Sequence, residues 1–355
     1  MSSKKFIAFV GVFAFLIVGF VGGVNYVIDP LWAFSHQNKF NQIQIGFDER
    51  QQKTNKIYFD RSINYNGILL GSSRATFINQ NYFNKNMKIF NYASSSMLPF
   101  EYKGYIDFAK KTRGKDLDYV IIGVDFFGSD TPKDIKFEKP EFYIKNTILP
   151  FYRYSSILSI ELFLKSIKNI KKMNAQSENF YSRDNVKTKT KSSEAKRIKA
   201  FKRNLKRHTD ELSGSKYTYN EDYFNILKTI KQENHKTKFI IFTSPVTADL
   251  ISSILIKGNN FENHRRWLTE TVEVFGEVYD FCGVNSITIN VYNYPDDDHY
   301  YPSIGKLISH KISGVEDNNI PNDFGVLVTK DNIQEHLRNL KEQIKAYDLN
   351  SIMHP

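Results

Sequence analysis

Residues 118–124 read Asp118-Tyr119-Val120-Ile121-Ile122-Gly123-Val124, a short run that is rich in β-branched residues and nearly all apolar. The run is too short for a typical helix and fits a buried strand better. A strand that is apolar on both faces is typical of the middle of a parallel sheet, because helices cover both sides of such a sheet. Residues 118–124 therefore predict a central parallel strand.

Working outward from this strand, four further stretches have the composition of strands. They are 66–71, 87–91, 238–243 and 277–281. Helical stretches such as 99–111 lie between them, and 333–349 has the apolar spacing of an amphipathic closing helix. Strands that alternate with helices indicate a doubly wound fold. We therefore expect an α/β fold with a five-stranded parallel sheet and helices on both faces.

The first residues of the chain predict a membrane anchor. Lys4 and Lys5 precede an uncharged run from Phe6 to Val24, which is close to the ~20 residues that span a bilayer. A cleaved signal peptide is the alternative, but residues 22–26 offer no clear small-x-small cleavage site. The two lysines place the amino terminus in the cytoplasm under the positive-inside rule.

The anchor sets the expected domain organisation. Pro30 disfavours helix at the residue before it, so the helix should end near Asp29. We expect residues 1–28 to form a cytoplasmic stub and a single transmembrane helix in the cytoplasmic (inner) membrane. Residues 29–355 then form an extracytoplasmic, or periplasmic, α/β domain.

The charge of the chain favours anionic partners. Its 355 residues include 49 Lys and Arg against 38 Asp and Glu, a formal net charge of +11. For a translocated domain, a cell-envelope glycan or another anionic polymer is a better candidate than nucleic acid. The alternative is a basic bias with no ligand. The single cysteine, Cys282, excludes an internal disulfide and a cysteine-based zinc site, and we expect it to be a small buried residue.

A basic region separates the third and fourth predicted strands. Residues 165–207 are dense in lysine, arginine and serine, and helical spacing recurs at 151–170 and 195–205. These features predict an inserted helical region at about 131–235, with a mobile lysine-rich loop at about 175–193. We expect residues 165–207 not to be a core element. A solvated charge run is the simpler interpretation. A lid that recruits an anionic polymer is the alternative.

Ser73 is the first candidate for chemistry. It lies in Gly71-Ser72-Ser73-Arg74, directly after the strand 66–71, where parallel sheets bind ligands. If a helix follows, its amino terminus and the amide of Ser73 can stabilise an oxyanion. The tetrapeptide alone is weak evidence, because glycine and serine are common in turns.

Two other strand ends should meet the same crevice. The small-residue loop from Asn91 to Ser96 follows the second strand and can supply a further oxyanion donor from its amides. Asp125 ends the strand 118–124. It can bind substrate, orient another residue or cap a helix.

His299 and Asp296 form the best candidate for a base and its orienting acid. They are part of Asp296-Asp297-Asp298-His299-Tyr300. In an Asp-x-x-His pair the carboxylate can accept from one ring nitrogen while the other faces a serine. A calcium or other hard-cation loop is an alternative for the three aspartates, but the glycine and terminal glutamate of a calcium loop are absent. We expect no metal and no cofactor.

Taken together, these features resemble a known family. They are the anchor, Asp29-Pro30, 48–53, 71–74, 91–96, 123–125 and 296–299, in the order seen in membrane-anchored SGNH-like hydrolases. The chain looks like the branch that contains the teichoic-acid D-alanylation protein and the alginate O-acetyltransferases. The resemblance implies a flavodoxin-like sheet and an enzyme that handles acyl groups on cell-envelope polymers.

The resemblance also assigns roles to residues. It makes Ser73 the nucleophile, His299 the base and Asp296 the orienting acid, and it places Ser95 or Ser96 near the oxyanion position. Arg74 joins Ser95, Ser96 and Asp125 as an oxyanion or substrate-binding candidate.

Two departures from the family pattern stand out. Ser72 replaces the aspartate of the usual Gly-Asp-Ser, and Asp125 stands where the family keeps an asparagine. A carboxylate can donate to an oxyanion only when it is protonated, so the departure at Asp125 bears directly on activity.

The sequence therefore predicts acyl transfer or ester hydrolysis, by an O-acetyltransferase or esterase that acts on an extracytoplasmic cell-envelope polysaccharide. One alternative is a catalytically inactive protein that binds or assembles an envelope polymer in the same crevice. Another is a subunit that receives acyl groups from a multi-spanning membrane partner, because a single anchor cannot carry an activated donor across the bilayer.

Overall fold

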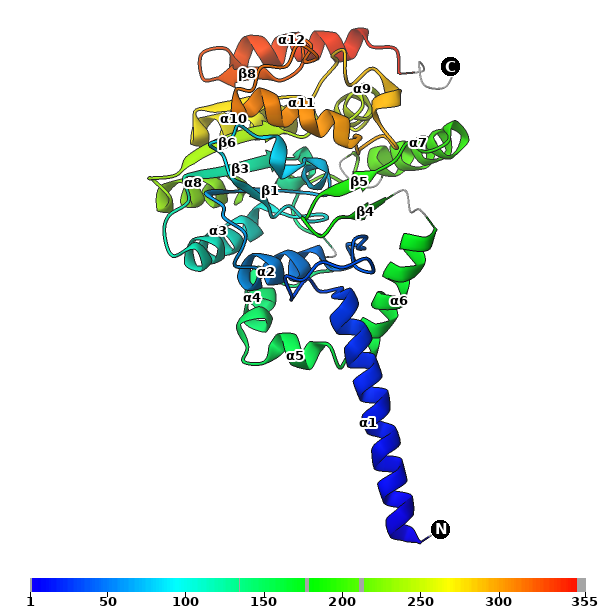
Figure 1. Cartoon of the computed structure of the whole chain (residues 1–355). Coiled ribbons are helices and arrows are strands. Elements are labelled where there is room, and N and C mark those ends of the chain that lie inside the picture. Colours follow the sequence, from blue (N-terminus) through cyan, green and yellow to red (C-terminus); the bar gives the residue numbers. More distant parts are fainter. Residues whose placement is uncertain (1, 134, 176–178, 211–213, 350–355) are drawn as a thin grey trace. The chain divides into compact units, whose positions relative to one another are not determined.

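The computed structural model describes residues 2–133, 135–175, 179–210 and 214–349 (Figure 1). The chain divides into two compact units. Unit 1 consists of Met1–Asn64 and Lys139–Thr188, and unit 2 of Tyr65–Glu138 and Lys189–Pro355. The insertion predicted at 131–235 is thus shared between the two units.

Unit 2 contains a six-stranded sheet in the order β2-β1-β3-β6-β7-β8. The strands are β1 (Gly67–Gly71), β2 (Ile89–Asn91), β3 (Tyr119–Val124), β6 (Lys238–Thr243), β7 (Glu277–Asp280) and β8 (Val326–Thr329). The first five run parallel, in the flavodoxin-like order 2-1-3-4-5 when counted along the chain. The predicted α/β fold with a mostly parallel sheet is confirmed. The antiparallel edge strand β8 was not predicted.

Both faces of this sheet are buried. Leu69 of β1, Ile121 of β3 and Phe242 of β6 share one apolar cluster with Ile304 and Ile308. Neighbouring residues in a strand point to opposite faces, and the strand residues next to these three, such as Ile68 and Ile122, are also fully buried. Helices therefore cover both sides, as the continuous apolar runs predicted.

The helices of unit 2 follow the strands. They are α3 (Pro99–Arg113), α7 (Glu194–Asp210), α8 (Tyr223–Glu233), α9 (Ala248–Ser252), α10 (Phe261–Phe275), α11 (Pro302–Ser313) and α12 (Ile333–Ala346), with a π-helical turn at Ser253–Lys257 and short 3₁₀ turns. Helix α3 contacts α8, and α8 contacts α10. The closing helix α12 is confirmed, since its four spaced apolar residues Ile333, Leu337, Leu340 and Ile344 are all buried.

Unit 1 begins with α1 (Ser3–Ile28), a helix long and apolar enough to span a membrane. Asp29 ends it in the left-handed region, at φ 47°. The carboxylate of Asp29 accepts from the amides of Ala33 and Phe34, at 2.9 and 3.0 Å. These bonds fix the exit of the chain from the helix at the predicted boundary.

The rest of unit 1 is formed by α2 (Glu49–Phe59), α4 (Pro140–Ile148), α5 (Tyr152–Ser156), α6 (Ile160–Asn174) and the hairpin β4 (Asn179–Tyr181) and β5 (Lys187–Lys189). Helix α6 contacts α1, and α4 contacts α2 (Figure 1).

The prediction of a mobile loop at 175–193 is wrong where the hairpin forms; residues 176–178 lie outside the described residues. Tyr181 and Arg183 are buried. Arg183 pairs with Asp29 at 2.7 Å, and the hydroxyl of Tyr181 donates to Glu49 at 2.5 Å. Long-range polar pairing orders this lysine-rich segment, and composition alone does not reveal such pairing.

Candidate active site

Gly71 gives the serine loop its position at the end of β1. Its φ of +145° is strained for any residue with a side chain, and a Cβ at this point would lie 2.8 Å from the Cβ of Ala75 and 2.9 Å from the carbonyl of Gly123. A 3₁₀ turn (η1, Ala75–Phe77) follows Ser73 instead of the expected α-helix. The hydroxyl of Thr76 donates to the carbonyl of Ser73 and holds this turn.

The structure brings Ser73 and His299 together across 226 residues of sequence. The distance from Ser73 Oγ to His299 Nε2 is 2.8 Å, within hydrogen-bonding range. His299 lies in the loop before α11, and its ring packs edge-on against Phe77 of η1. Serine and histidine are therefore arranged as the sequence predicted for a nucleophile and a base.

Two carboxylates face the other ring nitrogen of His299. Asp296 places its oxygens 3.1 and 3.2 Å from Nδ1, and Asp298 places one at 2.8 Å. Asp296 also accepts from the amides of Asp298 and His299, so it shapes the loop as well as facing the ring. Sequence reasoning selected Asp296 and missed Asp298.

These carboxylates control the protonation of His299. Burial by itself lowers the pKa of the imidazole, but Asp298 and Asp296 outweigh it and raise that pKa to about 10. Asp298 is held ionised in turn: burial opposes its charge, but His299, His208 and Arg74 keep its pKa well below the usual range. At neutral pH the resting site is an ion pair in which imidazolium donates to Ser73.

Arg74 links the serine loop to the histidine loop. Its Nε donates to the carbonyl of Asp298 at 2.8 Å, and its guanidinium pairs with Asp125 at 2.7 Å. A second nitrogen lies 3.8 Å from the carboxylate of Asp298. Arg74 is buried and stacks over Phe127. It positions the site, and it also reaches the cleft described below.

Asp125 lies apart from the position predicted for it. It is 7% exposed, its Oδ1 accepts from Arg74, and it is not among the residues that line the cleft. The carboxylate of Asp125 is therefore directed at Arg74 and not into the cleft, because the buried ion pair balances its charge there. Of the three roles predicted for Asp125, this pairing fits the one in which it orients another residue.

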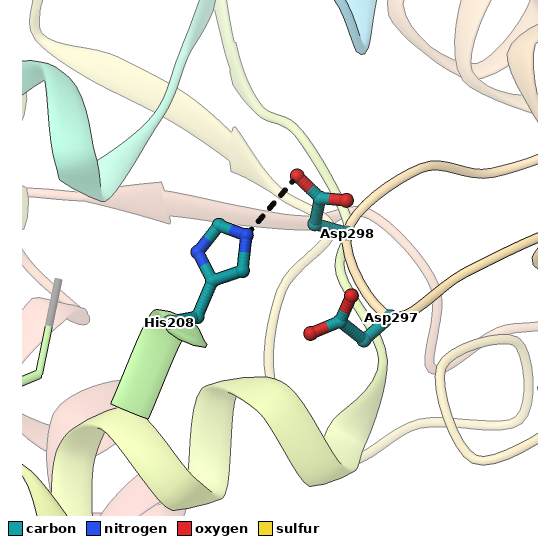
Figure 2. A group of neighbouring side chains, drawn as sticks. All are labelled: His208, Asp297 and Asp298. Carbon is teal, nitrogen blue, oxygen red and sulfur yellow. Dashed lines mark ion pairs between the residues drawn. The ribbon is translucent and has the colours of Figure 1, made fainter. Parts of the chain in front are cut away.

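A third carboxylate, Asp297, is buried beside this cluster (Figure 2). Neither of its oxygens has a hydrogen-bond partner within the described residues. Burial, with Asp298 and Asp296 nearby, raises the pKa of Asp297 to about 8. Asp297 is therefore a neutral carboxyl at neutral pH.

His208, at the end of α7, approaches Asp298 to 3.5 Å (Figure 2). His208, Asp297 and Asp298 form one group that could hold a metal ion, and Asp296, Asp298 and His299 form another. Arg74 and the protonated His299 supply positive charge to Asp298. The hard-cation interpretation of the aspartates stays a prediction. Nothing in the local sequence of α7 singled out His208.

Ser73 and His299 open onto a cleft with a volume of about 450 Å³. Its basic residues are Arg74, Lys133, Lys136, Arg207 and His208, and its acidic residues are Asp130 and Asp298. Apolar side chains, among them Phe127 and Phe137, form part of its wall. The cleft combines a positively charged rim with an apolar surface beside the serine.

The loop after β2 contributes one of its two candidate serines to the cleft. Ser96 lines it and has a positive φ of 53°. Ser95 is exposed and does not line it. Cys282 is half-buried rather than fully buried. Its thiol donates to the carbonyl of Ser244 at 3.1 Å, and burial raises its pKa to about 12, so it is an inert thiol.

Comparisons with known protein families, with curated proteins and with solved structures give no match to this chain. Conclusions about its chemistry therefore depend on the geometry of the site itself.

Proposed function

We propose that the chain handles acyl groups through Ser73, as an SGNH-like O-acyltransferase or esterase. The observation that carries this proposal is the 2.8 Å distance between Ser73 Oγ and His299 Nε2 at the carboxyl end of β1. The cleft beside these atoms provides room for a substrate. A serine, an imidazole and an orienting carboxylate are together sufficient for nucleophilic acyl transfer.

In the first half of the reaction, Ser73 Oγ attacks the carbonyl carbon of an ester. The new O–C bond forms as the hydroxyl proton passes to Nε2 of His299, which must be neutral to accept it. When the tetrahedral intermediate collapses, the bond to the leaving alcohol breaks and His299 returns the proton to that alcohol. Ser73 is left as an acyl ester.

In the second half, a hydroxyl group takes the acyl group from Ser73. His299 accepts the proton of that hydroxyl as its oxygen bonds to the acyl carbon, and then protonates Ser73 Oγ as it leaves. A sugar hydroxyl gives acyl transfer and water gives hydrolysis. Asp296 and Asp298 hold the ring in the required orientation through Nδ1.

The raised pKa of His299 makes the proposed reaction dependent on pH. Imidazolium cannot take the proton of Ser73, so the rate should rise as the pH approaches about 10. A substrate that lowers this pKa on binding would extend activity toward neutral pH.

The basic rim of the cleft supports a polymer of the cell envelope as acceptor. Lys136 and Arg207 are exposed and line the cleft, whereas Lys133 pairs with Asp130 at 3.1 Å. The positive charge of Lys136 and Arg207 suits an anionic glycan. The apolar helix α1 supports a single-pass anchor in the cytoplasmic membrane, with the amino terminus inside and the remaining chain extracytoplasmic. A multi-spanning membrane partner would then supply the acyl donor.

One observation favours the second candidate, a binding or assembly protein without turnover. In the resting site His299 is protonated and paired with Asp296 and Asp298, so it cannot act as a base, while exposed Lys136 and Arg207 still line the cleft. Such a site can hold an anionic envelope polymer without any chemical step.

Labelling with a fluorophosphonate probe tests the proposal. The probe reacts only with an activated serine, whose Oγ displaces fluoride from phosphorus. The full chain in detergent should label at pH 9, and Ser73→Ala and His299→Ala should each reduce labelling by more than about 10³-fold. Ser303→Ala is a matched control, because Ser303 is exposed on α11, and it should label like the wild type.

Circular dichroism shows whether each variant remains folded. If the folded wild type does not label between pH 7 and pH 10, the acyl-enzyme proposal is wrong. If polymer binding also persists in the Ser73→Ala and His299→Ala variants, the binding protein becomes the better assignment.

A further inference from the structure

An apolar face in unit 1 remains uncovered beside α1. It belongs to residues 148–164, which include α5 and the start of α6. Phe151 is 79% exposed, Ile160 70% and Leu164 61%. Among the described residues Phe151 is the most exposed large apolar side chain, and its φ of 61° is unusual for an aromatic residue. A contiguous apolar face of this kind marks an interaction site.

This face is fixed against the end of α1 by specific contacts. Asn25 donates to the carbonyls of Ile157 and Ser159, at 2.7 and 2.9 Å, and accepts from the hydroxyl of Ser166 at 2.8 Å. The rings of Phe20 and Phe163 lie 5.9 Å apart. Because Asn25 is fully buried, these bonds hold α6 in one position relative to α1.

The contacts also set the depth of the face in a bilayer. A helix rises about 1.5 Å per residue, and the hydrocarbon core is about 30 Å thick. The purely apolar run of α1 ends at Val24, because the polar Asn25 follows it. Gly22 approaches Leu158 so closely that a Cβ at Gly22 would lie 3.2 Å from its side chain. Leu158 therefore lies at the level where the hydrocarbon core of a bilayer crossed by α1 would end.

The exposed face of α6 is apolar at the start of the helix and positively charged further along. Ile160, Leu164, Lys168 and Lys171 follow one another at helical spacing and lie on one side. All four are exposed. The two apolar residues come first, where α6 contacts α1, and the two lysines follow within the next two turns. This order matches the passage from acyl chains to phosphate headgroups.

We propose that residues 148–164 lie in the membrane interface, with Phe151, Ile160 and Leu164 in the acyl boundary and with Lys168 and Lys171 at anionic phospholipid headgroups. The occupant of the face is the bilayer that α1 crosses, because the face is continuous with α1 and its charges complement anionic lipid. Unit 1 thus binds the bilayer in two ways: α1 spans it, and residues 148–164 lie on its surface. This inference depends on α1 spanning the membrane and is independent of the chemistry at Ser73.

Depth-dependent quenching tests the proposal on the full chain. Cys282 is the only cysteine, so Cys282→Ser provides a background for single-cysteine variants labelled with bimane. Phe151→Cys and Leu164→Cys probe the face, Phe13→Cys probes α1, and Tyr292→Cys is a water-exposed control in unit 2. Each protein is reconstituted in vesicles of phosphatidylcholine and phosphatidylglycerol, with or without lipid carrying a doxyl group at acyl carbon 5.

At positions 151 and 164 the doxyl lipid should reduce fluorescence about twofold, because interfacial segments lie about 5–10 Å into the headgroup boundary. Aqueous iodide should have little effect there but should quench position 292. Iodide quenching at 151 and 164 without doxyl quenching would overturn the proposal. Protection from both quenchers would overturn it in favour of a protein partner. An unquenched position 13 would overturn it too, since α1 would then not be inserted.

A charge variant sharpens the lipid assignment. Lys168→Glu with Lys171→Glu should weaken doxyl quenching at position 164 in vesicles that contain phosphatidylglycerol. Lys202→Glu with Lys206→Glu, on the basic helix α7 of unit 2, should not. Equal quenching in both double variants would contradict the proposed role of the headgroups. Fluorophosphonate labelling of the same samples reports separately on Ser73.

Discussion

The two units differ in the side chains that their central elements bury. In unit 2, the strands bury apolar side chains, and Ile68, Leu69 and Leu70 of β1 are fully buried. In unit 1, the whole first part of α2 is buried, and the buried residues from Glu49 to Lys56 are all polar or charged. Hydrophobic periodicity in the sequence predicts the buried strands of unit 2, but it does not predict that α2 of unit 1 is buried.

Directional bonds hold the core of unit 1 together. Gln51 donates to Thr147 at 2.8 Å and to Asn55 at 3.0 Å, which joins α2 to α4. Glu49 accepts from Tyr181, and Asp29 pairs with Arg183. Each of these bonds adds little net stability, but leaving one partner buried alone is costly. We therefore expect unit 1 to lose stability when a single polar partner is removed, and unit 2 to lose stability when side-chain volume is removed from its core.

The largest expected effect comes from breaking the ion pair in unit 1. Arg183→Ala leaves Asp29 buried without its partner and should lower the free energy of unfolding of unit 1 by about 3–5 kcal/mol. The chain has two tryptophans, Trp32 in unit 1 and Trp267 in unit 2. With 5-fluorotryptophan, ¹⁹F NMR during urea unfolding follows each unit by its own signal.

Two further variants control this measurement. Asp184→Asn changes an exposed neighbour and should alter stability by less than about 0.5 kcal/mol. The double variant Asp29→Asn with Arg183→Met removes both charges and should recover part of the loss. If Arg183→Ala costs no more than Asp184→Asn, the ion pair does not stabilise unit 1.

The second effect is a cavity in the apolar core. Leu69→Ala should lower the free energy of unfolding of unit 2 by about 2–5 kcal/mol, because Leu69 is fully buried and the space cannot collapse completely. The Trp267 signal reports this change. Leu69→Met conserves volume and should cost less than about 1.5 kcal/mol. If Leu69→Ala and Leu69→Met lowered the free energy of unfolding by similar amounts, the shape of the side chain, and not its volume, would determine the stability of this core.

The third effect is a pH response of opposite sign in the two units. Burial lowers the pKa of Lys53 in unit 1 to about 7, although Glu49 opposes the shift. Between pH 7 and 9 the folded state has released this proton, whereas an unfolded lysine, with its pKa of 10.5, still holds it. Unit 1 should therefore gain about 2 kcal/mol of stability over this range.

Unit 2 should lose stability over the same range. The folded state keeps protons on Asp297 up to about pH 8 and on His299 up to about pH 10, and the unfolded chain has already released both. Urea midpoints from the two ¹⁹F signals should thus move in opposite directions. Lys53→Met should flatten the response of unit 1, and Asp297→Asn should reduce that of unit 2. Parallel shifts of both midpoints would refute this assignment.

The smallest effect concerns the cluster of carboxylates around His299 in unit 2. Asp298→Asn removes the nearest charge from His299, so the pKa of the imidazole should fall toward its ordinary value. The pH at which fluorophosphonate labelling begins should decrease by about one unit, equivalent to about 1.4 kcal/mol. Asp331→Asn, at an exposed residue of unit 2, should leave it unchanged. An unchanged onset in Asp298→Asn would show that Asp296 alone sets the pKa.

The sequence was a good guide where local patterns carry the information. The five parallel strands, α1, α3 and α12 follow from runs and spacings of apolar residues. The proximity of Ser73 and His299 was predicted as well, from the position of Ser73 at a strand end and from the Asp-x-x-His pattern near the end of the chain.

The sequence failed where side chains pair across long distances. Asp125 turned to Arg74, and Asp298 and His208 joined the cluster around His299. Tyr181 and Arg183 ordered a segment that was expected to be mobile. The edge strand β8 was missed because exposed residues such as Val326 and Leu327 give it only a weak apolar signal.

Apolar runs in the sequence are enough to predict the α/β sheet and the amino-terminal helix, and two short motifs select Ser73 and His299. Which carboxylates face His299, how Arg74 is neutralised and why Tyr181 and Arg183 of a lysine-rich hairpin are buried become clear only in the folded chain. The physical reason is that burial of apolar surface is non-directional and leaves a periodic trace in the sequence. A hydrogen bond or ion pair needs two particular atoms in one geometry, and folding alone brings those atoms together.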